Sequence, residues 1–249
     1  MAKSRFEYVK RFELVDSLLP NCWIVVRIDG RNFRGLCDEH NFVKPNDFRA
    51  LQLMNRCAAD LMREHSQVVR CAFGQSDEFS FVLPPSCQLF NRRAFKYQSV
   101  FSSFFAASFV FHWSAFFPDT ALKFPPAFDA RAVAYPTVEN LRDYLSWRQA
   151  DCHINNLYNT VFWTLVLRGN LTRKEAQKRL CGTNSSDKNE ILFHEFGINY
   201  NNEEEIFRKG SFLFFRKSAS DDSETMIETA HTSIINDKLW EQYPHLLDR

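Results

Sequence analysis

The chain contains 249 residues, of which 45% are hydrophobic and 15% aromatic, so it can bury one sizeable core or two small domains that share an interface. Its 31 lysines and arginines balance 30 acidic residues, which excludes a uniformly basic body: any nucleic acid must be held by local clusters of positive charge. The seven cysteines form no CxxC pair, which predicts free thiols in a reducing compartment and no structural zinc.

The N-terminal part of the chain supports two predictions. One concerns the location of the protein, and the other concerns a first strand that ends in a carboxylate. Residues 1–17 lack an apolar secretory core and contain acidic residues that a transit peptide avoids, which favours the cytoplasm and leaves mitochondria open. The run "CWIVVRI" (22–28) is nearly all apolar, as in a strand covered on both faces, and it stops at Asp29-Gly30. After a loop, apolar residues at helical spacing predict a helix of about five turns over 48–66.

Two β-rich runs follow, and their connection predicts a hairpin with a second carboxylate at its tip. The runs "VVRCAF" (68–73) and "FSFVL" (79–83) are joined by "GQSDE", so Asp77 lies at the tip. A helix that begins basic and becomes aromatic is predicted over 91–117, followed by a short strand over 132–136. Serines and a histidine interrupt the apolar segment of this helix, which favours burial on most sides over a membrane span.

The back half of the chain is predicted to be mainly helical. We expect helices over 137–169, from the capping box at Thr172 to Gly182, and over 186–197, then a strand over 210–217. The acidic stretch 218–233 contains few large apolar residues and is predicted to be mobile, ahead of a short terminal helix. The order of elements predicts an α+β fold: a mixed, largely antiparallel sheet backed by helices on one face, plus a helical back half.

Two carboxylates at the ends of predicted strands are the leading candidates for chemistry. Asp29 closes a buried strand and Asp77 lies at a hairpin tip, and such positions in one sheet can meet at a single edge. Two-metal phosphoryl transfer needs at least two carboxylate ligands that bind the hard metal ions together. The carbonyl of Gly30 can approach an ion because no side chain intervenes. The alternative is that Asp29-Gly30 and Ser76-Asp77 are ordinary turn residues.

Two basic stretches are candidates for binding phosphate. Lys44, in "HNFVKPND", stands beside a predicted helix N-terminus, where free backbone amides favour phosphate. Arg92, Arg93 and Lys96 fall within one helical turn, which fits a grip on a nucleic-acid backbone or a phosphate tail. The alternative for both stretches is a solvated surface.

The segment "HINNLYN" (153–159) places polar side chains inside a helix that otherwise buries large apolar residues. Asparagine is a poor helix former, so these amides need hydrogen-bonding partners. They can pair with one another across an internal junction, or they can read bases in an unpaired RNA segment. The residues themselves leave both alternatives open.

Five motifs, in this order and spacing, resemble those of the histidine-tRNA guanylyltransferase family: "IDGRNF", "HNFVKPND", "GQSDEFSF", "SWRQADCHINNLYN" and "DKNEILFHEFGINYN". The resemblance covers roughly residues 1–216. It implies an enzyme that adds one guanosine to the 5′ end of histidine tRNA, a 3′–5′ polymerase with a palm-like catalytic domain. The implied division is a catalytic domain over 1–217, with a palm-like part (1–137) and a helical part for tRNA recognition and oligomerisation (138–217), before the acidic segment and terminal helix (218–249).

The resemblance also implies a reaction and its cofactors. ATP adenylylates the tRNA 5′-monophosphate, the 3′-hydroxyl of GTP then attacks with release of AMP, and pyrophosphate is finally removed. Two Mg²⁺ ions are implied, held by Asp29, Asp77 and the Gly30 carbonyl, with Glu78 beside them as a further catalytic residue. Because family enzymes are tetramers, a homotetramer is implied, with histidine tRNA and nucleotides as partners and no membrane.

The same motifs imply two further sets of residues. The nucleotide-binding set consists of Gly30, Arg31, Asn32, Phe33, Lys44, Asp47, Ser76, Arg93, Lys96 and Arg131. The tRNA-binding set consists of His153, Asn156, Lys188 and Glu190. Two other functions stay open: templated 5′-end repair of other tRNAs, and a non-catalytic RNA-binding scaffold. The intact pair Asp29 and Asp77 weighs against the scaffold, which would need no metal ligands.

Overall fold

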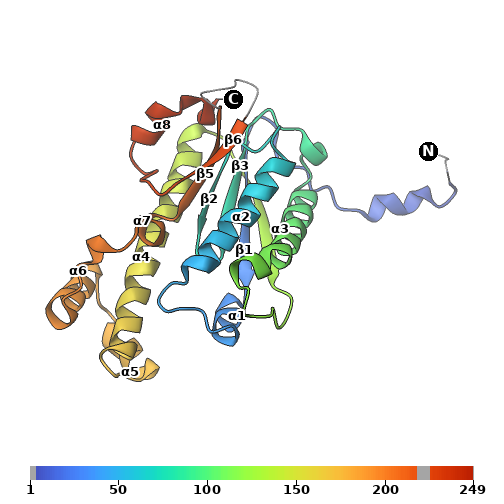
Figure 1. Cartoon of the computed structure of the whole chain (residues 1–249). Coiled ribbons are helices and arrows are strands. Elements are labelled where there is room, and N and C mark those ends of the chain that lie inside the picture. Colours follow the sequence, from blue (N-terminus) through green and yellow to red (C-terminus); the bar gives the residue numbers. More distant parts are fainter. Residues whose placement is uncertain (1–3, 218–224, 249) are drawn as a thin grey trace.

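The computed structural model describes residues 4–217 and 225–248 and places the strands in one six-stranded sheet. From edge to edge the strands run in the order β4, β1, β3, β2, β5, β6 (Figure 1). Their bounds are Trp23–Arg31 (β1), Cys71–Gln75 (β2), Glu78–Leu83 (β3), Ala127–Tyr135 (β4), Ser211–Lys217 (β5) and Thr225–Ala230 (β6). All neighbouring strands are antiparallel, so the described part of the chain lacks the parallel component of the predicted mixed sheet.

The helices pack on the sheet or extend beyond the end at which β1 leads into α1, the lower end in Figure 1. The α-helices span Phe33–Glu39 (α1), Phe48–Glu64 (α2), Ala94–Phe116 (α3), Val138–Leu167 (α4), Arg173–Leu180 (α5), Ser185–Glu190 (α6), Glu205–Lys209 (α7) and Lys238–Gln242 (α8). Short 3-10 segments lie at Glu7–Phe12, Leu89–Arg92, Tyr200–Asn202 and Pro244–Leu247, and a π-helical turn spans Ile191–Glu195. The predicted helices over 48–66, 91–117 and 137–169 are confirmed, whereas α1 and β6 were not predicted.

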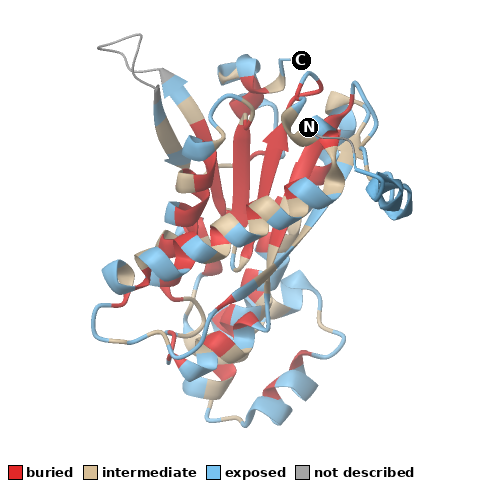
Figure 2. Ribbon diagram, turned by 90° about the vertical axis from the view of Figure 1, so that its right-hand side faces the viewer, coloured by how far each residue is buried: buried red, intermediate tan, exposed pale blue. Residues whose placement is uncertain are grey.

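Helices cover both faces of the sheet, which corrects the prediction of helices on one face only. On β1, Ile24, Val26 and Ile28 join the core that α2 and α3 complete, whereas Trp23 and Val25 join a second core with α4 and α8. Figure 2 shows the buried central strands between helices whose outer faces are exposed. Successive side chains of a strand point to opposite faces, so a run that is apolar at every position needs cover on both.

Helix α3 buries only one face. By length and composition it is the one helix among the described residues that could cross a membrane. Tyr97, Phe101 and Phe105 are fully buried in the core beneath it, but Phe111 on the outer side is 80% exposed. The prediction that this helix is buried on most sides is therefore wrong, because α3 is an outermost layer and nothing in the described chain covers its other face.

Helix α4 connects the sheet to a small helical lobe. Its 30 residues correspond to about 45 Å of helix. The first half packs on the sheet, and the second half extends beyond it, where Leu157, Val161 and Leu165 form a third core with α5 and the segment after it (Figure 1). The predicted capping box between Thr172 and Glu175 starts α5. One helix thus carries side chains to both the sheet and the lobe.

The C-terminal segment only partly matches the sequence prediction. Residues 218–224 of the predicted mobile stretch lie outside the described residues, but residues 225–230 form β6 and pair with β5. Mobility is therefore wrong for β6: its backbone completes the sheet edge, and Ile227 packs against the core. The short terminal helix is confirmed as α8, whose Trp240 is buried.

Candidate active site

The two strand-end carboxylates meet at the lower end of the sheet. Strands β1 and β3 pair with Asp29 opposite Glu78, and the two-residue turn Ser76-Asp77 joins β2 to β3. The backbone amide of Gly30 donates a hydrogen bond to the carbonyl of Asp77 at 3.0 Å. The predicted meeting of the two strand ends is therefore confirmed, with Asp77 directly beside the end of β1.

Gly30 permits this close approach. A Cβ atom at position 30 would lie 2.7 Å from Cδ2 of Phe33 and 2.9 Å from Cβ of Asp77. Real Cβ atoms do not approach so closely, so any other residue would displace Asp77 or Phe33. Glycine at position 30 is thus required by packing, whatever further role its carbonyl has.

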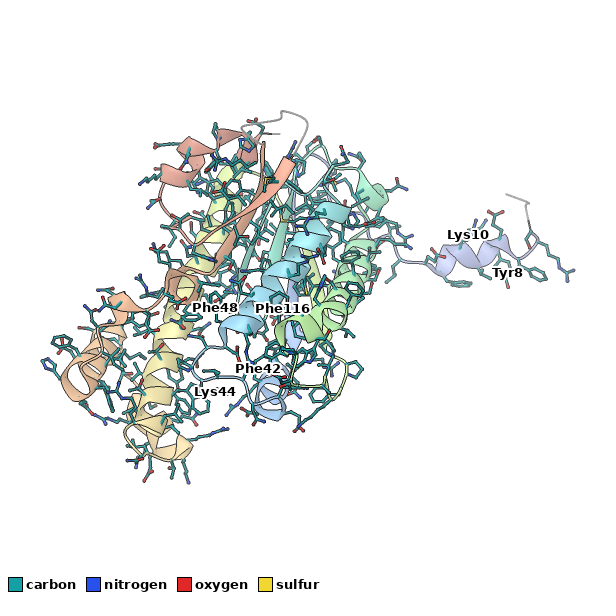
Figure 3. All side chains as sticks on the ribbon, in the orientation of Figure 1. Tyr8, Lys10, Phe42, Lys44, Phe48 and Phe116 are labelled. Atoms are coloured by element: carbon teal, nitrogen blue, oxygen red, sulfur yellow. The ribbon has the colours of Figure 1, made fainter. Side chains whose placement is uncertain are left out.

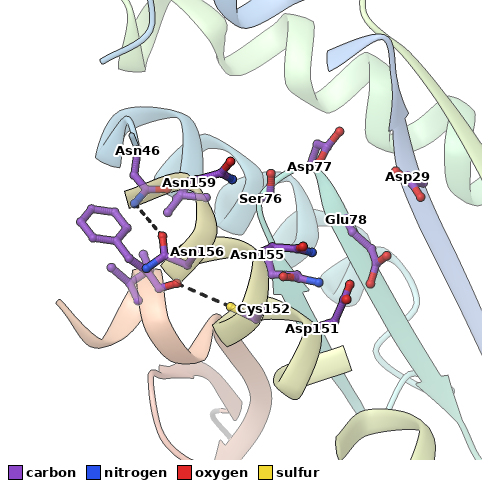
Figure 4. A pocket seen from close by; sticks show the side chains of 14 residues that line it. Asp29, Asn46, Ser76, Asp77, Glu78, Asp151, Cys152, Asn155, Asn156 and Asn159 are labelled. Carbon is purple, nitrogen blue, oxygen red and sulfur yellow. Dashed lines mark hydrogen bonds between the residues drawn. The ribbon is translucent and has the colours of Figure 1, made fainter. Parts of the chain in front are cut away.

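A cavity of about 240 Å³ opens beside these residues between β3 and α4 (Figure 4). Its walls carry the carboxylates of Asp29, Asp77, Glu78 and Asp151. The amides of Asn46, Gln75, Asn155, Asn156 and Asn159 also line it. We call this cavity the acidic pocket. It combines acceptors for a cation with donors for the polar groups of a nucleotide.

The environment of Asp77 raises the pKa of its carboxyl group. Burial, and to a lesser degree the charge of Asp29, raise the pKa of Asp77 to about 6, although hydrogen bonds from its own backbone and from Ser76 oppose the shift. A cation placed between the carboxylates would relieve both the burial cost and their repulsion. The electrostatics of the site therefore favour metal binding at neutral pH.

The donor set at this end of the sheet fits Mg²⁺ bound together with a triphosphate. Proteins commonly hold Mg²⁺ through one or two carboxylates plus substrate phosphates, and Asp29 and Asp77 supply the carboxylates. Within residues 4–217 and 225–248, no group of three or more His, Cys, Asp or Glu is arranged to hold a metal ion. Phosphate or water oxygens would therefore have to complete the coordination.

The raised pKa of Asp77 makes the metal-free protein less stable as pH rises. The folded-state pKa of about 6 exceeds the ordinary value of 3.8, so folding favours the protonated form and stability falls between about pH 4 and pH 6. Asp77→Asn removes this penalty and should stabilise the metal-free protein at pH 7.5 by up to about 3 kcal/mol, with no difference near pH 4. Urea unfolding in EDTA measures the free energy of unfolding of wild type and of Asp77→Asn at both pH values. Equal stability of the two proteins at pH 7.5 would show that the pKa of Asp77 is not raised by folding.

Glu78 is held by two arginines. Nη1 of Arg148, on α4, donates to both Glu78 carboxylate oxygens at 3.0 and 3.3 Å, and Nε of Arg27 lies 3.7 Å from Glu78 Oε2. Burial raises the pKa of Glu78 even though Arg148 and Arg27 act to lower it. Arg27 also lies 3.5 Å from Asp29. Glu78 therefore anchors the charged network at the pocket, and the catalytic role expected from the sequence stays a prediction.

The sequence reasoning did not single out Arg27, Arg148 or Asp151. Arg148 is buried, donates to Asp151 at 3.3 Å as well as to Glu78, and lies over the ring of Trp147. A signal was present, because Arg27 interrupts an apolar strand on the same face as Asp29. An arginine at such a position needs a carboxylate partner, and the hairpin supplies it in Glu78.

The residues expected at the nucleotide are partly engaged in local structure. Asp47 caps α2: its carboxylate accepts from the backbone amides of Val43 and Arg49 and from the Arg49 side chain. Arg31 is exposed at the end of β1, and Asn32 adopts a left-handed conformation (φ 53°) that starts α1. Arg31 and Asn32 follow Asp29 and Gly30 directly in the sequence. Lys44 lies in a neighbouring cavity described below.

Arg93 and Lys96 are not brought to the acidic pocket. Phe109 in the second half of α3 packs on Phe33 beside the pocket, with ring centroids 6.0 Å apart. Arg93 precedes Phe109 by sixteen residues, about 24 Å along the helix. It pairs with Asp16 at 2.9 Å. Within one chain, α3 therefore carries both residues to the opposite end of the sheet from this pocket. Their expected role at phosphates of a second nucleotide or of the tRNA 5′ end stays a prediction.

Arg131 lies on the edge strand β4, exposed and directly opposite Arg27. It shares a sheet face with Asp29, whose cross-strand neighbour on β4 is Asp129. Arg131 thus borders the acidic pocket without lining it.

The four residues expected to contact tRNA lie on the helical side of the molecule. Lys188 donates to the carbonyl of Thr183 at 2.7 Å, and Glu190 pairs with His194 at 2.6 Å. His153 is exposed on the turn of α4 that lines the acidic pocket, with its ring 5.5 Å from that of Tyr200. It is therefore closer to the catalytic candidates than its place in the back half suggested.

Asn156 has a structural role. It is buried, its Nδ2 donates to the hydroxyl of Tyr200 at 2.9 Å, and its Oδ1 accepts from Asn46 Nδ2 at 2.8 Å (Figure 4). The side chain thus joins α4 to the loop before α2. The contacts of Asn156 thus fit the internal-junction alternative, and its expected role in tRNA recognition stays a prediction.

Comparison with known proteins supports one family over nearly the whole chain. A family model described as tRNAHis guanylyltransferase matches residues 6–136, and one described as Thg1 C terminal domain matches residues 139–242. A Bos taurus protein named "Probable tRNA(His) guanylyltransferase" is 50% identical over 100% of this chain and 89% of its own. The tRNA(His) guanylyltransferase of Saccharomyces cerevisiae is 50% identical over 98% of this chain and 100% of its own.

Solved structures agree with this result. The crystal structure of tRNA(His) guanylyltransferase from Saccharomyces cerevisiae matches with a TM-score of 0.80 and 48% identity, covering 90% of this chain and 96% of that one. A bacterial tRNA(His) guanylyltransferase-like protein in complex with ATP has the same fold, with a TM-score of 0.78 at 22% identity over 98% of this chain and 99% of that one. On its sequence and its fold, the chain belongs to the tRNAHis guanylyltransferase family.

Proposed function

We propose that the activity of this family, addition of a guanosine to the 5′ end of histidine tRNA, takes place in the acidic pocket. The observation that carries the proposal is the meeting of Asp29 and Asp77 at one end of the sheet, with Gly30 between them. These three residues would hold two Mg²⁺ ions, which neutralise phosphate charge and activate the attacking oxygen when bound. The surrounding amides, including Asn155 and Asn159, are placed to bind and orient the nucleotide.

The reaction we propose has three steps. ATP adenylylates the tRNA 5′-monophosphate with release of pyrophosphate, and the 3′-hydroxyl of GTP then attacks the activated phosphorus with release of AMP. A second pyrophosphate is finally removed from the triphosphate of the added nucleotide. Bacterial relatives of the same fold bind ATP and GTP, which supports both as substrates here. Arg27 and Arg148 hold the neighbouring carboxylates in place, so that Asp29 and Asp77 keep their geometry through successive attacks at phosphorus.

The direct test incubates the full chain with 5′-phosphorylated histidine tRNA, Mg²⁺, ATP and labelled GTP. Labelled histidine tRNA and an unlabelled non-histidine tRNA are the expected result. Labelling of 5′-truncated tRNAs of several kinds would favour templated repair. Binding of RNA with no labelling of any tRNA would favour the scaffold and refute the proposed activity.

Recognition of histidine tRNA is proposed to involve His153, Lys188 and Glu190. His153 is exposed beside the acidic pocket, whereas Lys188 and Glu190 lie on α6 in the lobe. Imidazole and charged side chains can make specific hydrogen bonds to unpaired bases. His153→Ala should lower the efficiency on full-length histidine tRNA far more than on a tRNA that is already 5′-adenylylated and lacks its anticodon loop. Equal slowing of both, with a lower melting temperature, would instead indicate a structural role against Tyr200.

A homotetramer is also proposed. The segment that contains the 3-10 turn Glu7–Phe12 extends from the body as an arm (Figures 1 and 3), and Phe12 and Val15 on this arm are 79% and 94% exposed. The outer face of α3 is another open apolar surface. Apolar surface of this kind is typical of protein interfaces. Light scattering of the full chain measures the mass, and a monomer at micromolar concentration would refute the proposal.

The division of the chain and its location are proposed on the sequence. The catalytic domain would comprise residues 1–217, with tRNA recognition in its helical part, and limited proteolysis tests this division.

A cytoplasmic location is proposed from the acidic residues near the N-terminus, and imaging of the tagged full chain tests it.

A further inference from the structure

A second cavity adjoins the acidic pocket and has the opposite charge. It has a volume of about 550 Å³, lies between α1 and the second half of α4, and shares Ser76 and Asp77 with the acidic pocket. Its walls carry the cations Arg34, Lys44, Arg173 and Lys174. The walls also contain the aromatic rings of Phe33, Tyr158, Phe162 and Trp163. We call it the basic cavity; positive charge with aromatic surface is the combination that binds single-stranded nucleic acid.

One carboxylate lies between two of these cations. Asp38, near the end of α1, approaches Lys44 Nζ at 3.1 Å through Oδ1 and Arg173 Nη1 at 3.6 Å through Oδ2. Lysine and arginine that converge on one carboxylate are arranged equally well for a phosphate, which offers more oxygen acceptors. All three side chains are partly or largely exposed, so exchange of one anion for another needs no rearrangement of the core.

The same two cations lie against an indole ring. Lys44 Nζ is 5.3 Å and the Arg173 guanidinium carbon 5.0 Å from the ring centroid of Trp163. Across the cavity, these charged and cation-π contacts connect α1, the loop before α2, α4 and α5. Exposed contacts of these kinds are each weak, about 1 kcal/mol or less. A ligand that offers both phosphate and an aromatic base can therefore compete with them.

We propose that Lys44, Arg173 and Trp163 bind a terminal nucleotide of the tRNA. Its phosphate takes the position of the Asp38 carboxylate, and its base stacks on the indole. This inference rests on the proposed function, since it places the RNA beside the reacting carboxylates. The shared wall at Asp77 allows the 5′ end to reach the acidic pocket while the adjoining part of the RNA lies over Trp163.

The position of Arg173 favours RNA over a free nucleotide as the ligand. An ATP that reacts at Asp29 and Asp77 needs its own phosphates there. Arg173 and Lys174 instead begin α5, on the lobe side of the cavity. We assign the phosphates that reach this wall to the tRNA, and the contact should then contribute to the salt dependence of RNA binding. The alternative is the triphosphate of GTP, which reacts through its 3′-hydroxyl, and separate binding measurements distinguish the two.

The test measures binding of 5′-phosphorylated histidine tRNA and of GTP separately. Arg173→Ala should weaken tRNA binding about 10- to 100-fold and lower the slope of log affinity against log salt by about one, with GTP affinity unchanged. Trp163→Leu should weaken tRNA binding with little change in that slope, because stacking is not ionic. Arg179→Ala, on the same helix but outside the cavity and paired with Glu195, is the matched control and should bind normally.

Asp38→Asn gives the sharpest result, because the competing carboxylate is removed. It should tighten tRNA binding by up to about fivefold while lowering the melting temperature of the free protein. If Asp38→Asn and Arg173→Ala both lower the melting temperature and leave tRNA affinity unchanged, the cluster only fastens the lobe and the proposal is wrong. A loss of GTP affinity in Arg173→Ala equal to the loss for tRNA would assign the phosphate to the nucleotide and would also overturn it.

The failure of this site and the failure of the proposed activity are distinguishable. Wild-type binding and transfer are measured on the same tRNA. Binding that depends on Arg173, without guanosine transfer by wild type, would keep this site and reject the activity. If wild type transfers guanosine but substitutions at Arg173, Trp163 and Asp38 leave tRNA affinity unchanged, the activity is kept and this site is rejected.

Discussion

Asp29→Asn and Asp77→Asn are each expected to abolish guanosine addition to histidine tRNA while leaving the fold intact. Each change removes one proposed metal-binding carboxylate and keeps the shape of the side chain. Loss of a partner that merely orients a metal ligand costs about 10- to 100-fold in activity, so loss of a ligand itself should exceed roughly 100-fold. Folding should not suffer, because each change relieves the repulsion between two close carboxylates.

The matched control for this experiment is Asp129→Asn. Asp129 lies directly opposite Asp29 on the neighbouring strand and faces the same side of the sheet, but it does not line the acidic pocket. Its loss changes the net charge by the same amount and should leave transfer within a few-fold of wild type. Single-turnover rates at saturating Mg²⁺ measure all three variants. Activity near wild type in Asp29→Asn or Asp77→Asn would refute the proposal that these two carboxylates bind the metal ions. An equal loss of activity in Asp129→Asn would also refute it.

Arg148→Met is expected to cause the largest loss of stability. The guanidinium is buried, donates to both oxygens of Glu78 and to Asp151, and its removal leaves the Glu78 carboxylate without its closest partner. Breaking a buried ion pair from one side costs about 3–5 kcal/mol, because the remaining charge stays desolvated. Glu78 should take up a proton, since burial already raises its pKa.

The double variant Glu78→Gln with Arg148→Met separates the cost of an unpaired charge from the loss of packing. Removing both charges should recover most of the lost stability, because a neutral pair no longer carries an uncompensated ion. Urea unfolding at pH 7.5 gives the free energies of the two single variants and of the double variant. If the losses of the single variants simply add, Arg148 stabilises the fold through its contacts with Trp147 and Asp151, and the pair with Glu78 is unimportant.

The elements of the fold could be predicted where the sequence pattern reports local geometry. Apolar spacing identified α2, the aromatic run identified α3, and Thr172 and Glu175 marked the start of α5. The hairpin was predictable because its turn residues suit a tight connection, and this placed Asp77 at a strand end. Such features depend on neighbours in sequence, so a single chain is enough to show them.

Which face each element buries was decided by tertiary packing. Strand β6 belongs to the acidic stretch 218–233, whose composition is typical of a mobile segment, yet the strand forms because β5 offers it an edge. Helix α3 has an apolar composition that suits burial all round, but it packs as an outer layer and keeps Phe111 exposed. Composition alone cannot distinguish these outcomes, since burial depends on which surface the rest of the chain leaves available.

For the site, the candidate groups Asp29, Gly30 and Asp77 could be identified from the sequence, through their predicted strand ends and the family motifs. Which other residues lie beside them depended on how the chain packs. The tertiary structure placed Arg27 and Arg148 against Glu78, buried Asn156 in a junction, and carried Arg93 to the far end of the sheet. The physical reason is that motif spacing records position along the chain, whereas pairing depends on strand register and helix length, which carry residues of one motif to opposite ends of the molecule.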